Sequence, residues 1–168
     1  MQYGRFEDLP VWNDAADFAV LIYKFTAAEQ FHRHYGLRDQ FERAALSVSN
    51  NIAEGFERGS TNELLAFLYI ARGSAGEVRS MLKVLLRWED FNDLKSQISN
   101  LITDSEKISR QLYGWIESLK NSNIAGQRHL DDKARNRYAT KHDKQDFIEE
   151  LDRITKTEAE KQNPTKKP

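Results

Sequence analysis

The feature that most constrains this chain is its shortage of proline. Only Pro10, Pro164 and Pro168 occur, so 153 consecutive residues between the first two contain no helix breaker. This absence favours long helices. Cysteine is absent too, which excludes disulfides, thiolate zinc sites and cysteine nucleophiles. Because 39% of the residues are hydrophobic and 11% are aromatic, the chain can form a core.

Apolar residues recur in steps of three and four in four segments. The spacing predicts helices over residues 10–29, 37–57, 60–88 and 94–119. Ser60-x-x-Glu63 has the form of a capping box at the start of the third helix. Since the connections are only a few residues long, neighbouring helices should run in opposite directions. The sequence therefore predicts an all-α protein whose residues 1–120 form an up-down-up-down antiparallel four-helix bundle.

The composition changes after residue 120. Residues 121–168 contain 11 Lys plus Arg and 9 Asp plus Glu, so this charged extension nets +2 and the bundle nets −3. We expect residues 121–142 to be a flexible connector and residues 143–160 to form one amphipathic helix. The apolar residues of that helix are Phe147, Ile148, Leu151 and Ile154. The start of the chain has neither signal-peptide nor membrane-span character, so a cytoplasmic location is expected.

Polar and small residues form rows beside the predicted core on the second and third helices. A glycine inside a helix costs about 1 kcal/mol relative to alanine, and close approach of another backbone is the usual reason for one. We expect a polar seam between helices or subunits, in which Glu54 pairs with Arg43 or Arg58 in a buried network; a solvated face and a ligand site are alternatives. The candidate seam comprises Arg43, Ser47, Asn50, Asn51, Glu54, Gly55, Arg58, Gly73, Gly76, Glu77 and Ser80.

Several of these residues stand in motifs that resemble a known family. The motifs are Asn50-Asn51-Ile52-Ala53-Glu54-Gly55 with Arg58, Ile70-Ala71-Arg72-Gly73-Ser74 with Glu77, the opening Phe6-Glu7-Asp8-Leu9-Pro10-Val11-Trp12, and Tyr35-Gly36-Leu37 followed by Gln40, Arg43-Ala44-Ala45 and Ser47. Over residues 5–118 the chain resembles the bacterial four-helix bundle proteins encoded in 23S rRNA intervening sequences. Related bundles are accessory proteins of diversity-generating retroelements.

The resemblance implies a non-enzymatic homo-oligomer, most simply a pentamer, that works with RNA or with a reverse transcriptase and its RNA. No cofactor or metal is implied. Basic residues and one aromatic residue are the candidates for nucleic-acid contact. They are Arg33, Arg38, Arg72, Arg79 and Arg87 in the bundle, and Lys133, Arg135, Arg137, Tyr138, Lys141 and Lys144 in the extension.

Two other function classes remain open. The first is a protein-binding adaptor that does not contact RNA. The second is a ribonuclease of the HEPN class, whose R-x(4–6)-H motif is matched by Arg135 or Arg137 with His142. That motif arises readily by chance in an arginine-rich chain, and its residues lie outside the predicted bundle. His32 and His34 could offer two metal ligands, but no carboxylate or cysteine stands at a supporting spacing, and an exposed loop is the simpler expectation.

Overall fold

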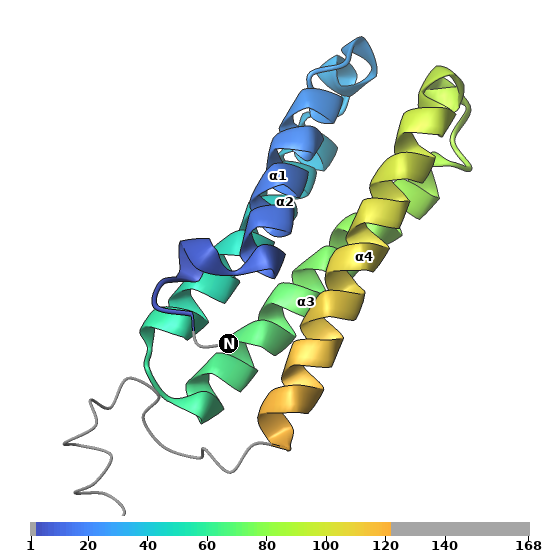
Figure 1. Cartoon of the computed structure of the whole chain (residues 1–168). Coiled ribbons are helices and arrows are strands. Elements are labelled where there is room, and N and C mark those ends of the chain that lie inside the picture. The colour runs from blue at the N-terminus through green and yellow to red at the C-terminus, as the bar shows by residue number, and fades with distance from the viewer. Residues whose placement is uncertain (1–2, 122–168) are drawn as a thin grey trace, which may run out of the picture. The chain divides into compact units, whose positions relative to one another are not determined.

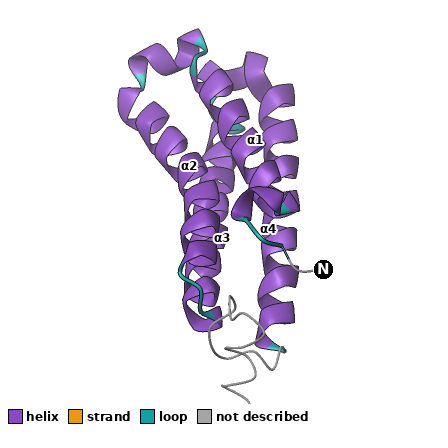
Figure 2. Cartoon of the chain, turned by 60° about the vertical axis from the view of Figure 1, so that its left-hand side comes forward, coloured by secondary structure: helices purple, strands orange, loops and turns teal. Residues whose placement is uncertain are grey.

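The computed structural model describes residues 3–121. The predicted connector, the predicted helix at 143–160 and every candidate residue of the extension lie outside the described residues. Figure 2 shows that nearly all of the described chain is helical, with short loops between the helices. The elements in order are η1 (Phe6–Asp8), α1 (Pro10–Thr26), η2 (Glu29–Arg33), α2 (Tyr35–Glu57), α3 (Thr61–Leu85), η3 (Glu89–Leu94) and α4 (Lys95–Lys120).

The four long helices form an antiparallel bundle, which confirms the predicted fold class. The α1–α2 and α3–α4 connections lie at one end of the bundle, and the short α2–α3 connection lies at the other (Figure 1). Each helix packs on the one before it, and α1 also packs on α4. None of the helices within residues 3–121 combines the length and apolar character that a membrane span requires.

Most residues of the rows that the helical spacing singled out are in the core. The predicted row of α3 is buried without exception: Leu64, Leu68, Ala71, Ala75, Val78, Leu82 and Leu85. On α4 the predicted row is buried from Ile98 to Leu112, but its last members, Trp115 and Leu119, are half-buried and Ile116 is buried instead. The one polar residue in the row, Ser105, is fully buried. Its hydroxyl donates a hydrogen bond of 2.8 Å to the backbone carbonyl of Ala75, so α4 is joined to α3 inside the core. The serine is thereby compatible with burial.

The structure corrects the ends of two predicted helices. α1 stops at Thr26 rather than residue 29, and α3 stops at Leu85 rather than residue 88. In each case a short 3-10 helix follows and turns a phenylalanine inward, Phe31 from η2 and Phe91 from η3. The two rings are fully buried and meet edge to face at 5.1 Å between centroids. A continued α-helix would not bring them together at this end of the bundle.

One glycine explains how closely α2 and α3 approach. A Cβ atom added to Gly55 on α2 would lie 2.7 Å from the Cβ of Phe67 and 3.2 Å from Cδ1 of Leu64, both on α3. Real atoms do not pack this tightly, so only glycine allows this contact. Gly114 on α4 is different, because a Cβ there would meet nothing within 4 Å.

We therefore expect Gly55→Ala to lower the free energy of unfolding by about 1–3 kcal/mol, the usual cost of overpacking, although alanine is the better helix former. The matched control Gly114→Ala should raise it by up to about 1 kcal/mol, because the new methyl group meets open space. Chemical denaturation of both variants measures the difference. Equal stabilities of the two variants would show that α2 and α3 do not approach closely at Gly55.

Glu42 connects the end of α1 to α2. Its carboxylate accepts hydrogen bonds of 2.7 Å from the Thr26 hydroxyl and 2.7 Å from Nε of Arg38, and its side chain is 17% exposed. Burial raises the pKa of the Glu42 carboxyl, but the hydrogen bonds from Arg38 and Thr26 outweigh it and hold the pKa below its usual value of 4.5. The carboxylate form is therefore the stabilising one.

Stability from Glu42 should be present above its unfolded pKa of about 4.5 and lost as the pH falls through the lower folded value. Thermal melting across this range should show a lower melting temperature for Glu42→Gln than for the unsubstituted protein near neutral pH. The difference between the two melting temperatures should become smaller in acid. The control Glu57→Gln removes the same charge at an exposed position of the same helix and should leave the melting temperature near neutral pH almost unchanged. A difference in melting temperature that stays the same at every pH would contradict this role of Glu42.

Candidate nucleic-acid interface

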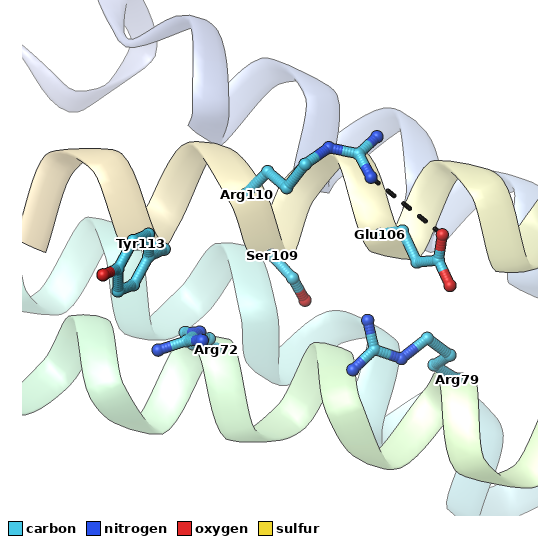
Figure 3. Close-up of a pocket in the computed structure, with 6 residues that line it drawn as sticks. All are labelled: Arg72, Arg79, Glu106, Ser109, Arg110 and Tyr113. Atoms are coloured by element: carbon cyan, nitrogen blue, oxygen red, sulfur yellow. Dashed lines mark ion pairs between the residues drawn. The ribbon is translucent and has the colours of Figure 1, made fainter.

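A pocket lies on the surface where α3 and α4 run side by side. It encloses about 550 Å³ and is lined by Arg72 and Arg79 of α3 and by Glu106, Ser109, Arg110 and Tyr113 of α4. Figure 3 shows the two α3 arginines on one side and the four α4 residues on the other. The register of the core produces this arrangement, because the lining residues flank the buried rows of both helices.

Positive charge dominates the α3–α4 pocket. Three guanidinium groups line it with a single carboxylate, and Glu106 forms only a long ion pair of 4.0 Å with Arg110, whose side chain is 70% exposed. Arginine is the side chain best suited to phosphate, because its planar group can donate two parallel hydrogen bonds and keeps its charge. The pocket is therefore suited to an anionic ligand.

An aromatic ring completes the α3–α4 pocket. The guanidinium of Arg72 lies over the ring of Tyr113, 5.0 Å from the centroid, and the tyrosine is 50% exposed. Figure 3 shows this pair at one end and Arg79 with Glu106 at the other, with Ser109 between them. The pocket thus has an aromatic end and a purely ionic end.

The structure separates the candidate nucleic-acid contacts of the bundle. It brings Arg72 and Arg79 into one pocket. Arg38 instead forms an ion pair with Glu42 within the chain. Arg33 in η2 and Arg87 just after α3 are exposed, at the end of the bundle that carries the α1–α2 and α3–α4 connections. The candidates of the extension, Lys133, Arg135, Arg137, Tyr138, Lys141 and Lys144, lie outside the described residues.

Sequence reasoning missed Arg110 and Tyr113. A signal for them existed, since Glu106, Ser109, Arg110 and Tyr113 follow the i, i+3, i+4, i+7 spacing of one helix face. That face lies next to the apolar row of α4 and is turned toward α3. Spacing alone did not show that α3 would present two arginines opposite it.

The candidate polar seam is divided between the α2–α3 contact and the surface. Between the helices, the hydroxyls of Ser47 and Ser74 lie 3.0 Å apart. The amide of Asn51 donates to the Ser47 carbonyl at 2.7 Å and to its hydroxyl at 2.9 Å. Near the α1–α2 connection, Gln40 donates to Glu77 at 3.0 Å. The Ser47–Ser74 and Gln40–Glu77 hydrogen bonds join α2 to α3, and the two bonds of Asn51 lie within α2.

The expected buried network around Glu54 is wrong for the single chain. Glu54 does accept a hydrogen bond of 2.7 Å from Arg58, but both side chains are half exposed, and Arg43 pairs with Asp39 instead. The reason is the register of α2, which turns Arg43, Asn50 and Glu54 away from α3. An exposed ion pair four residues apart on a helix contributes little to stability.

The glycines of α3 have no packing explanation among the residues that the structure describes. A Cβ atom on Gly73 or Gly76 would meet nothing within 4 Å, and Gly73 is exposed. The close approach that these glycines predicted is found at Gly55 instead. Ser80 is also exposed on α3.

Comparisons with known proteins agree with this bundle. The chain is similar to a crystal structure of a protein of unknown function from the S23 ribosomal protein family of Bacteroides thetaiotaomicron, with 29% identity and a TM-score of 0.58 over 64% of this chain and 98% of that chain. No curated protein matches the chain. Residues 7–114 match the family described as 23S rRNA-intervening sequence protein. The chain belongs to the 23S rRNA-intervening sequence protein family.

Proposed function

We propose that this protein is a non-enzymatic, homo-oligomeric scaffold that binds structured RNA through the α3–α4 pocket. The observation that carries the proposal is that Arg72, Arg79 and Arg110 line one pocket with a single carboxylate and an exposed tyrosine. The name of the family, 23S rRNA-intervening sequence protein, supports an association with RNA. We further propose that the scaffold acts in the cytoplasm and that it serves as an accessory factor to a reverse transcriptase.

The net charge of −1 is compatible with RNA binding, because binding depends on local charge. An arginine cluster on one face attracts phosphates even when acidic residues elsewhere balance it. An oligomer would present the α3–α4 pocket once per subunit, so that modest contacts add up.

Gly73 of α3 supports the oligomer. Two glycines in the middle of a helix lower its stability by about 1 kcal/mol each, and nothing within residues 3–121 makes use of the space they leave. A second subunit that approaches α3 closely at Gly73 would explain that residue, whereas Gly76 lies between Arg72 and Arg79 on the face of the α3–α4 pocket. Five subunits is the number that the family resemblance implies.

A protein-binding adaptor is the second candidate function. The observation in its favour is a set of exposed apolar residues on α1 and α2, namely Val20, Leu21, Tyr23 and Leu46. Exposed apolar surface of this kind suits a protein partner. An adaptor would show little salt-dependent binding of RNA. The third alternative, a HEPN-like ribonuclease, depends on Arg135, Arg137 and His142, which lie outside the described residues.

Binding of an RNA hairpin to the full chain at several salt concentrations tests the proposal. Replacing Arg72, Arg79 and Arg110 by glutamine should weaken binding and reduce the slope of log K against log salt by about 0.7–1 per arginine. The matched control replaces Arg5, Arg43 and Arg58, which are exposed and paired with carboxylates, and so changes the net charge equally.

Failure of the unsubstituted protein to bind the hairpin, or equal effects of the two triple substitutions, would contradict RNA binding by the α3–α4 pocket. Binding that is lost only in the pocket variant would support it. Intact RNA after incubation is expected, and cleavage that disappears in His142→Ala would favour the ribonuclease instead.

Light scattering tests the oligomer. The unsubstituted protein should have a mass several times the 19.5 kDa of one chain, and Gly73→Gln should reduce the mass toward 19.5 kDa without loss of helix content. The fold should tolerate this change because a Cβ at Gly73 meets open space. Gly114→Gln, at an equally open position on α4, should keep the oligomer. A monomer before substitution, or an intact Gly73→Gln oligomer, would contradict the scaffold.

A further inference from the structure

Two tyrosines on the α3–α4 face each have a cationic side chain of the opposite helix over the ring. Arg72 of α3 lies over Tyr113 of α4 at 5.0 Å, and Lys120 of α4 lies over Tyr69 of α3 at 5.6 Å, both measured to the ring centroid. The tyrosines remain 50% and 45% exposed. A cation on one face holds each ring in place, and the exposed part of the ring stays open to a ligand.

The cation–tyrosine pairs and the remaining arginines follow one another along the bundle. Along α3, Tyr69 is three residues before Arg72 and Arg79 is seven residues after it, which corresponds to about 4.5 and 10.5 Å of helix rise. Arg79 and Arg110 lie toward the other end of the pocket, beside Glu106 (Figure 3). The face therefore offers aromatic surface at one end and phosphate-binding groups at the other.

Resting on the proposed function, we infer that the α3–α4 face binds a single-stranded segment of the RNA, with unpaired bases stacked on Tyr113 and Tyr69 and phosphates held by Arg79 and Arg110. Unpaired bases expose their faces to aromatic rings, whereas the bases of a duplex are stacked on one another. A phosphorylated peptide would use the arginines and leave the two tyrosines without a role.

The closing experiment compares two labelled RNAs, a short single strand and a blunt duplex of the same sequence, with the full-length protein. Tyr113→Leu should weaken binding of the single strand roughly 5- to 100-fold, the effect expected for loss of one stacked base, and the Tyr69→Leu/Tyr113→Leu double variant should weaken it further. Tyr113→Phe should retain the affinity. Tyr35→Leu, at a residue that is 75% exposed on α2, is the matched control and should change nothing.

The outcomes separate this inference from the proposed function. Single-strand affinity that survives in the double leucine variant but is lost on replacement of Arg72, Arg79 and Arg110 would overturn stacking and leave RNA binding intact. Equal losses for single strand and duplex would also overturn it. If the unsubstituted protein binds neither RNA, both proposals fail. A loss confined to the single strand, with rescue by phenylalanine, is the expected result.

Discussion

The hydrogen bond from Ser105 to the carbonyl of Ala75 is the interaction on which the α3–α4 face depends. It is fully buried, and a hydroxyl in an apolar core is costly unless it has a partner. A shift of α4 by one helical turn would remove that partner, so the bond favours a single register. In this register Tyr113 lies opposite Arg72, and Arg79 lies near Glu106. The core thereby determines which charged groups meet at the surface.

The α2–α3 contact serves a different purpose. Gly55 brings the backbones close, and the Ser47 and Ser74 hydroxyls with the Asn51 amide satisfy one another at the edge of the contact. Because these short side chains bond to each other, few of their polar groups remain for a ligand. The α2–α3 contact therefore has a structural role. The outward glycines of α3 then stand out, because nothing in the described part of the chain fills their space. The described bundle thus combines a tightly packed α2–α3 contact with a basic pocket between α3 and α4.

The number, order and direction of the helices could be predicted, because the apolar row of α3 repeats without a gap, the row of α4 is interrupted only at Ser105, and the connections are short. The ends of α1 and α3 could not, because burial of Phe31 and Phe91 ended those helices early and that packing involves residues 60 positions apart. Only the α3 side of the α3–α4 pocket was predicted from the sequence. Arg72 and Arg79 were chosen for their charge, but Arg110 and Tyr113 became relevant only once the rotation of α4 against α3 was known. Periodicity gives the buried face of a helix and does not give its neighbour. The Glu54–Arg58 pair is exposed in the single chain for the same reason.

The central claim is that RNA contacts this protein on the α3–α4 face. Ultraviolet cross-linking of a bound RNA to the full chain, followed by mass-spectrometric mapping of the linked peptides, tests it most directly. The account predicts links at Tyr113 and Tyr69 and in the peptides that hold Arg72 and Arg110. Links confined to α1, α2 or residues 122–168 would contradict it.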